Sequence, residues 1–452
     1  MNRRTGGTWD VVIAGGGVAG VSVAAALGEF GYRVLLVEPG LNGAKRLAGE
    51  LIHPPGVSDL ADLGLLAPLE RIGVAPVLGF AVSPHADAAP YLLPYGAIPG
   101  VRRRGFALDH AVLTVTLFAA AKQLPHVTTW QDARVCDLDL TPDGATVLIA
   151  RPNGPTSVRA RLVVAADGGA STVRRLASIA HTRVRLSHML GVQLPGPLPE
   201  AGFGNVFLGG PAPVLAYAID DVTARVMFDV PGNPDGIAAV RRDPAYLAAL
   251  PREFRERVRA AVHAEPGLVC ANYCVVPEAV ATGCVVLVGD AAGSCHPLTA
   301  TGLSACTRDA IRLRQALREA DGDIPLAVRR YARARGGPQR TRVALAEALY
   351  RAFADPSDEM RLLRNGILKF WQRSRRGRAA SMALLSTHEG RMSVMAVQYA
   401  RVLGYALTGL VRLRGDGRAR SPLARARAVM RLTRAALGLL AQAYRGRRLR
   451  HT

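Results

Sequence analysis

The sequence predicts an α/β fold with a nucleotide-binding domain, a mixed β-sheet domain and a C-terminal helical region. Three observations predict it. A glycine-rich turn at Gly15 to Gly20 follows an apolar strand, and a second strand-turn-helix unit begins much later, at Gly289. Between these turns, residues 212–219 and 224–230 are typical of strands, which indicates a sheet inserted between parts of the nucleotide-binding domain.

Composition and length set the frame for these elements. The chain has 452 residues, 49% of them hydrophobic and 20% charged, which is typical of a globular protein with several domains. The net charge is +22, and residues 412–452 carry twelve Arg against the single acid Asp416, a net of +11. The other residues therefore carry 22 − 11 = +11. The basic excess is concentrated in the tail.

The cysteines and the N-terminus indicate a cytoplasmic protein. The six cysteines include no CxxC pair, so we expect neither a disulfide framework nor a zinc site, and no other metal-ligand pattern is present. Arg3 and Arg4 precede an apolar run, as in an export signal. However, Asp10 and several glycines interrupt that run.

The first turn is typical of dinucleotide binding. It follows a strand, contains Gly15, Gly17 and Gly20 in GxGxxG spacing, and opens a helix. Gly15 allows the tight turn, Gly17 lets the backbone approach a pyrophosphate, and Gly20 lets the helix pack on the strand. The N-terminus of the helix offers free N–H groups to the phosphates.

Glu38 closes the next predicted strand, 18 residues after Gly20. A carboxylate at this position can accept hydrogen bonds from both ribose hydroxyls, which favours FAD or NAD over NADP.

The central turn follows an apolar strand that we expect to end at Asp167. Gly168, Gly169, Ser171 and Arg174 come next. Ser171 is a candidate helix cap, and by itself the turn could be any strand-to-helix connection.

The late turn follows a strand that we expect to end at Asp290, and a helix begins near Gly302. A carboxylate at the end of a strand suits a polyol hydroxyl, and a helix N-terminus suits an anion. NAD needs only the first turn. FAD also has a ribityl chain and a ring that becomes anionic on reduction, so the late turn, with Gly289, Asp290 and Gly302, favours FAD.

With these three turns, the chain resembles the flavoprotein monooxygenases of the p-hydroxybenzoate hydroxylase fold. That family is marked by GxGxxG, a DG turn and a GD turn, which here are Gly15 to Gly20, Asp167–Gly168 and Gly289–Asp290. Residues 46–65, 289–305 and 381–407 are similar to segments of its squalene epoxidase branch.

The resemblance implies a role for several residues. Glu38 and Arg46 would hold the adenosine half of FAD, and Val18 and Ala19 would lie along the pyrophosphate. Asp290 would meet the ribityl chain, and Leu303 would lie near the flavin ring. Further implied cofactor contacts are Gly15, Gly17, Gly20, Asp167, Arg174, Gly289 and Gly302.

The resemblance also implies the domain organisation. Residues 1–75, 106–180 and 275–345 would form a discontinuous, Rossmann-type FAD-binding domain. Residues 76–105 and 181–274 would form a mixed β-sheet substrate domain, and residues 346–452 a basic, membrane-associating helical region.

The implied activity is that of an FAD-dependent monooxygenase reduced by NADPH or NADH, directly or through a flavin reductase. Through a flavin C4a-hydroperoxide it would epoxidise or hydroxylate a lipophilic, prenyl- or terpenoid-derived substrate with dioxygen. The alternatives are an aromatic polyketide or quinolone hydroxylase and a flavin-dependent prenyl reductase of the same fold. A basic membrane-binding protein with a vestigial nucleotide fold is the non-enzymatic alternative.

The chain departs from the branch at four sites. His53 replaces a glutamine, Phe80 an aromatic residue with a hydroxyl, Val112 an arginine, and Ala300–Thr301 a double glycine. Arg102 to Arg104 lie near enough in sequence to replace the arginine lost at Val112.

His53 is the one candidate catalytic residue. It could bond the flavin edge or ionise a phenol, or it could be a satisfied turn histidine. His296 precedes Pro297 in the late loop, and we interpret it as structural.

The tail favours a membrane surface as a partner. Residues 392–411 are nearly long enough to span a bilayer, but Arg401 near their centre argues against crossing. Arg427, Arg431 and Arg434 then recur at helical spacing, as in a basic amphipathic helix. We therefore expect peripheral membrane contact, and the lack of a nucleic-acid-binding motif argues against DNA or RNA.

Overall fold

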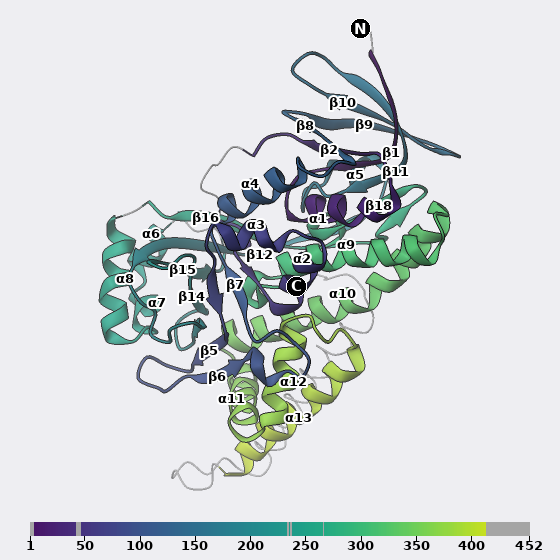
Figure 1. Cartoon of the computed structure of the whole chain (residues 1–452). Helices are drawn as coiled ribbons and strands as arrows, with labels where there is room; N and C mark the ends of the chain where they lie inside the picture. The colour runs from purple at the N-terminus through teal and green to yellow at the C-terminus, as the bar shows by residue number, and fades with distance from the viewer. Residues whose placement is uncertain (1–3, 42–46, 233–234, 236, 265, 413–452) are drawn as a thin grey trace.

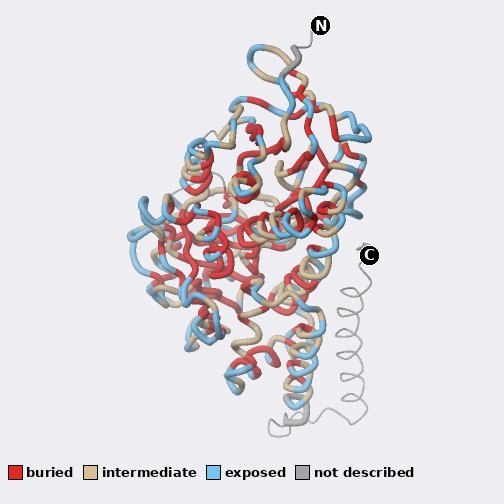
Figure 2. Tube along the Cα trace, turned by 45° about the vertical axis from the view of Figure 1, so that its right-hand side comes forward, coloured by how far each residue is buried: buried red, intermediate tan, exposed pale blue. Residues whose placement is uncertain are grey.

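The computed structural model describes residues 4–41, 47–232, 235, 237–264 and 266–412. It has two large sheets side by side and a group of helices below them (Figure 1). Buried segments run through both sheets and the helices between them, and the outer turns of the last helices are exposed (Figure 2).

The first sheet has eight strands in the order β17-β18-β11-β1-β2-β8, with β10 pairing β11 and β9 at one side. Its members are β1 (Arg4–Ala14), β2 (Val34–Glu38), β8 (Val127–Gln131), β9 (Arg134–Thr141), β10 (Gly144–Ala150), β11 (Thr156–Ala165), β17 (Ala281–Thr282) and β18 (Val285–Leu287). The pairs that β1 makes with β2 and β11 are parallel, as is the pair of β11 with β18. Because parallel strands end at the same edge, the first, central and late turns meet there.

Helices cover this sheet. They are α1 (Val18–Ala26), α2 (Pro54–Asp62), α3 (Leu66–Arg71), α4 (His110–Ala121), α5 (Thr172–Leu176) and α9 (Gly302–Glu319). A short 3-10 turn, η1 (Gly28–Phe30), follows α1. Aliphatic side chains of α1, α4 and α9 share a core with β1, β2, β11 and β18. The helix predicted near Gly302 is confirmed, because α9 begins there.

The second sheet has seven strands in the order β16-β12-β15-β14-β13-β5-β6. They are β5 (Gly79–Ser83), β6 (Tyr91–Pro94), β12 (His181–Pro195), β13 (Gly204–Phe207), β14 (Val214–Ala218), β15 (Thr223–Val230) and β16 (Leu268–Pro277). Every pair is antiparallel except β13 with β5. One face packs on α6 (Ala238–Arg242), α7 (Pro244–Ala248) and α8 (Arg252–Ala264). The two strands predicted at residues 212–219 and 224–230 are confirmed as β14 and β15.

The other face of the second sheet packs on the C-terminal helices α10 (Ile324–Ala354), α11 (Asp358–Arg373), α12 (Arg375–Leu385) and α13 (Met392–Arg412). A small third sheet has three strands in the order β3-β7-β4, and all three come between β2 and β8 along the chain. They are β3 (Leu51–Ile52), β4 (Ala75–Val77) and β7 (Gly105–Ala107). The remaining 3-10 turns are η2 (Tyr95–Ala97), η3 (Gly289–Ala292) and η4 (Pro297–Thr299). The domain boundary predicted between residues 345 and 346 falls inside α10, so no break in the chain marks it.

Three further expectations can be compared with the structure. All six cysteines are free thiols, as expected. Ser171 caps α5, because its hydroxyl accepts the N–H of Arg174 at 3.0 Å. The ends predicted for two strands were wrong, since β11 ends at Ala165 and β18 at Leu287, before Asp167 and Asp290. The chain has already turned out of the sheet at these two acids, and Gly168 and Gly289 take positive φ values of 78° and 56°.

Candidate cofactor site

The first turn has the geometry that its glycines predict. Gly15 has a φ of +104°, which favours glycine, and its N–H donates to the carbonyl of Val37 at 2.7 Å. A Cβ on Gly20 would lie 1.8 Å from the carbonyl oxygen of Gly15, so α1 can approach β1 only through a glycine.

Gly17 faces open space, in contrast to Gly15 and Gly20. A Cβ at Gly17 would meet no atom of the described residues within 4 Å. Gly17 is also the N-cap of α1, and no described side chain caps that end. The N–H groups of Val18 and Ala19 are therefore among those that a helix leaves without internal partners. Uncapped N–H groups beside open space fit a pyrophosphate.

Glu38 holds the first turn directly. Its Oε2 accepts the N–H of Gly16 at 2.6 Å, and its Oε1 accepts the N–H of Gly40 at 2.9 Å. The residue is buried at the end of β2. Each carboxylate oxygen can accept a further hydrogen bond, so Glu38 can orient the turn and still receive ribose hydroxyls. Arg46, the other residue implied for the adenosine half, lies outside the described residues.

The late turn lies against the N-terminal parts of two helices, α1 and α9. A Cβ on Gly289 would lie 2.9 Å from Cβ of Ala19 in α1 and 3.0 Å from Sγ of Cys306 in α9. The turn therefore joins the first turns of both helices. Asp290 is solvent-exposed although Gly289 and Ala291 beside it are buried, so its carboxylate can reach a ligand.

The start of α9 resembles that of α1. Its N-cap, Thr301, makes no side-chain capping bond among the described residues, and a Cβ on Gly302 would meet nothing there within 4 Å. Leu303 is buried against Gly49. The protein thus presents two uncapped helix N-termini on either side of Gly289, and this arrangement fits the pyrophosphate and the far half of FAD.

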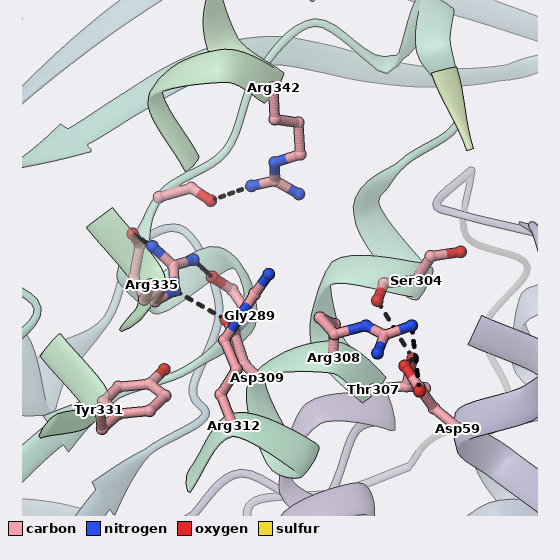
Figure 3. A network of polar contacts seen from close by, with 12 residues as sticks. Asp59, Gly289, Ser304, Thr307, Arg308, Asp309, Arg312, Tyr331, Arg335 and Arg342 are labelled. Carbon is pink, nitrogen blue, oxygen red and sulfur yellow. Dashed lines mark hydrogen bonds and ion pairs between the residues drawn. The ribbon is translucent and has the colours of Figure 1, made fainter. Parts of the chain in front are cut away.

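A buried ion pair that the sequence did not reveal fixes the late turn (Figure 3). Asp309 on α9 accepts the N–H of Gly289 at 3.0 Å and pairs with Nε of Arg335 on α10 at 2.9 Å. Arg335 also donates to the carbonyl of Ala292 at 2.7 Å. Tyr331 donates to the carbonyl of Leu287 at 2.7 Å. Arginines abound on α9 and α10, so only burial distinguishes Arg335 and its partner from surface charges.

Arg174 joins the central turn to the late turn. Its guanidinium donates to the carbonyls of Gly169 and Ala291, both at 2.8 Å, and it is almost fully buried. Asp167 accepts the N–H of Val173 at 3.0 Å, and its Oδ1 is buried without a partner among the described residues. The structure therefore gives Arg174 a positioning role, and direct contact of Asp167 and Arg174 with FAD stays a prediction.

His53 is fully buried, and both of its ring nitrogens are engaged. Nε2 donates to the carbonyl of Thr299 at 3.0 Å, and Nδ1 accepts the hydroxyl of Tyr95 at 2.6 Å. Because a carbonyl only accepts, the ring is the neutral Nε2–H tautomer. Burial lowers the pKa of His53 to about 4. Of the two hypotheses for His53, this arrangement supports the satisfied turn histidine; a direct catalytic role stays a prediction.

This burial makes stability depend on pH. His53 has an ordinary pKa near 6.5 when unfolded, so its neutral folded form contributes stability that is lost as pH falls from about 6.5 to about 4. The loss amounts to about 3 kcal/mol. We expect His53→Gln, whose amide can make both bonds, to flatten this loss. Burial raises the pKa of Asp59 to about 6, so this residue makes the folded state more stable as pH falls. The effect is the same in both proteins and therefore cancels in the difference between their stabilities. Denaturant unfolding of both proteins across this range tests it, and parallel curves would contradict it.

A second buried network links the second large sheet to the segment before β3 and to the start of α4. Arg225 on β15 donates to both oxygens of Glu50, at 2.7 and 3.0 Å, and the Tyr217 hydroxyl donates to Glu50 at 2.9 Å. Arg225 also approaches Asp109, the N-cap of α4, at 3.4 Å. The network fixes the second sheet to the segment that precedes β3.

His296 ties the late loop to the second sheet. Its Nδ1 accepts the N–H of Leu298 at 3.2 Å, so Nε2 carries the proton and donates to Asp229 at 3.1 Å. Ser187 donates to the same carboxylate, and the ring of Tyr350 stacks on His296 at 4.0 Å. The bonding supports the interpretation of His296 as a structural residue.

The departures from the branch lie in different surroundings. Phe80 is buried, with its ring 5.9 Å from that of His53. Val112 is exposed on α4, and Arg102 to Arg104 are exposed in the loop before β7. The residues that the structure describes include no group of three or more His, Cys, Asp or Glu side chains placed to hold a metal.

Comparison with known sequences places this geometry in a family. The squalene epoxidase family model matches residues 159–423. Squalene epoxidase erg1 of Aspergillus fumigatus is 30% identical over 384 residues, which cover 80% of this chain and 79% of that protein. Squalene monooxygenase of Mus musculus is 28% identical over 378 residues, covering 80% of this chain and 65% of that protein.

Solved structures share the fold. p-Nitrophenol 4-monooxygenase PnpA of Pseudomonas putida superimposes with a TM-score of 0.71 at 20% identity, covering 85% of this chain and 99% of that one. PqsL of Pseudomonas aeruginosa, a probable FAD-dependent monooxygenase, gives 0.64 at 24% identity, covering 77% of this chain and 97% of that one.

Proposed function

The chain belongs to the squalene epoxidase family, and from this premise we propose that it epoxidises a carbon–carbon double bond of a prenyl- or terpenoid-derived molecule. It is an FAD-dependent monooxygenase acting on a lipophilic substrate. The observation that favours epoxidation over phenol hydroxylation is the bonding of His53. With both ring nitrogens engaged, it has no free nitrogen with which to ionise a phenol.

The cofactor contacts are part of the proposal. Gly17, Val18 and Ala19 would hold the pyrophosphate, Glu38 the adenosine ribose, and Asp290 the ribityl chain. The N-terminus of α9, at Gly302 and Leu303, would face the flavin ring. Bound FAD, reduced by NADPH, supplies the activation of dioxygen. The protein's own part is to orient the reacting double bond and to exclude water. Alkene epoxidation needs no general base, so the engaged ring of His53 and the absence of a required ionisable group agree with this reaction.

An apolar cavity supports a lipophilic substrate. A cavity of about 60 Å³ lies among α10, α11, α12 and α13, lined mainly by aliphatic and aromatic side chains. Its walls include Leu363, Ile367, Trp371 and Tyr399. The hydroxyl of Tyr399 is buried without a partner among the described residues, so it is free to bond a polar end of a ligand.

Filling this cavity should impair use of long substrates. Ala348 on α10 lines it, whereas Ala334 on the same helix is exposed and does not. We expect Ala348→Leu to raise KM for a long isoprenoid alkene about tenfold, because the added methyl groups occupy the space of the substrate's chain. The control variant Ala334→Leu should leave KM unchanged. Steady-state kinetics at saturating NADPH measures both, and equal KM values for the two variants would remove the cavity from the substrate path.

The membrane contact and the source of electrons also belong to the proposal. No helix in the part of the chain that the structure describes is long and apolar enough to cross a bilayer. The predicted basic amphipathic helix lies outside the described residues. We propose peripheral attachment through that segment, and reduction by NADPH either directly or through a separate reductase.

The test is turnover with isotopically labelled dioxygen. The FAD-loaded chain is incubated with NADPH and squalene, or with a shorter isoprenoid alkene, and the product is analysed by mass spectrometry. One labelled oxygen atom in an epoxide supports the proposal. Labelled phenol from aromatic substrates with no epoxide would favour the hydroxylase instead. Saturation of the alkene without oxygen uptake would favour the reductase.

A further inference from the structure

A polar pocket lies behind the late turn, where α9, α10 and the turn between α12 and α13 meet. Its cavity volume is about 30 Å³. Arg308 and Arg312 line it from α9, Arg342 from α10, and Thr387 and Glu389 from the turn. The hydroxyl of Thr341 on α10 donates to the carbonyl of Gly390 at 2.7 Å and holds the turn in place.

Two buried polar atoms in the walls of this pocket have no partner among the described residues. Arg342 is 7% exposed and donates through Nη2 to the carbonyl of Gly293 at 2.8 Å, but its Nε is unpaired. The hydroxyl of Thr387 is also buried and unpaired. Native proteins rarely leave such groups unsatisfied, so they indicate a bound polar species.

The charges around the pocket have an excess of arginine (Figure 3). Four guanidinium groups, those of Arg308, Arg312, Arg335 and Arg342, accompany the three carboxylates of Asp59, Asp309 and Asp290. The difference is 4 − 3 = +1. Glu389 does not reduce it, because its carboxylate is engaged by Arg391, which lowers its pKa.

Arg308 is only weakly neutralised. Its Nη2 lies 3.3 Å from Oδ1 of Asp59, and its side chain is 30% exposed. Burial raises the pKa of Asp59 to about 6 in spite of this neighbour. Arg308 therefore has donors left for a ligand that enters from solvent.

We propose that this pocket binds a phosphate group, with Arg308, Arg312, Arg342 and Thr387 as its donors. Guanidinium groups match phosphate oxygens in geometry and charge, and the bond to an anion would satisfy the two unpaired donors. The phosphate comes from a phospholipid headgroup or from a soluble phosphate. Leu384 of α12 lines both this pocket and the apolar cavity, so an acyl chain has an apolar neighbour there.

The first experiment titrates inorganic phosphate into the FAD-loaded full chain by calorimetry at constant ionic strength. We expect saturable binding that Arg308→Gln weakens at least tenfold. Thr387→Val, which removes the unpaired hydroxyl and no charge, should also weaken it. Arg318→Gln is the matched control, since Arg318 lies on the same helix but pairs with Glu29 at the surface. Equal phosphate affinity in all four proteins overturns the proposal. So does the absence of binding both to inorganic phosphate and to the vesicles described below.

Vesicles distinguish the two sources. Flotation with phosphatidylcholine vesicles, with and without phosphatidylglycerol, is compared for the unaltered chain, Arg308→Gln and Arg318→Gln. All three carry the same basic tail, so a tenfold loss of binding confined to Arg308→Gln assigns the pocket to the headgroup. Equal vesicle binding together with the Arg308-dependent phosphate titration assigns it to a soluble phosphate. Neither experiment measures epoxidation, so the proposed function can fail while this site stands.

Discussion

A Gly20→Ala variant is expected to lose FAD and to unfold far more easily than the unaltered chain. The new Cβ would lie 1.8 Å from the carbonyl oxygen of Gly15, which is backbone and cannot rotate away. Helix α1 would have to move off β1, which carries the buried residues Val11 and Ile13 beneath it. Overpacking of this kind costs about 3 kcal/mol or more.

Two further glycine variants make this prediction specific. Gly17→Ala adds its methyl group to open space, so its apoprotein should unfold like the unaltered one, while FAD binds at least about tenfold more weakly. Gly404→Ala, in α13, also meets open space and should be neutral or slightly stabilising. Thermal unfolding with and without FAD, and flavin fluorescence titration, measure both effects. Tight FAD binding by Gly17→Ala would place the pyrophosphate elsewhere.

Arg335→Met is expected to cost about 3 kcal/mol of folding free energy, because it removes the fully buried partner of Asp309 and leaves that carboxylate with Arg312 alone, at 3.2 Å. The carbonyl of Ala292 loses its donor at the same time, so the late turn loosens. We therefore expect weaker FAD binding in addition to the loss of stability.

The double variant Asp309→Leu with Arg335→Met tests the cause. Because it removes both charges, it should be less destabilised than the sum of the two single variants. Arg330→Gln, on the same helix, breaks an exposed pair with Glu319 and should cost no more than about 1 kcal/mol. Denaturant unfolding gives all four values. Additive single and double variants would show that the ion pair does not hold the turn.

The sequence predicted those parts of the site that depend on local chain geometry. The turn at Gly15 to Gly20, the strand end at Glu38, the cap at Ser171 and the start of α9 all follow from residues close together in the chain. A glycine or a cap residue has a meaning within a few positions, so a pattern can reveal it.

The parts that the sequence did not predict depend on distant partners. His53 is bonded by Tyr95 and Thr299, which are 42 and 246 residues away, so the sequence left its two roles open. Asp309 lies among the arginines of α9 and looks like a surface acid until α10 buries it against Arg335. The same holds for Glu50 and Arg225, which are 175 residues apart. Burial of a charge is a property of the assembled fold.

Helix α10 gives the molecule a mechanical connection. Its 31 residues span about 46 Å, and it carries Tyr331 and Arg335 at the late turn and Ala348 at the apolar cavity. Pro338 lies between these two ends and removes one internal hydrogen bond, which makes it the natural point of bending. A ligand bound in the apolar cavity would thus contact the same helix that bonds the carbonyls of the late turn. Any tilt of α10 must either be absorbed at Pro338 or reach the late turn.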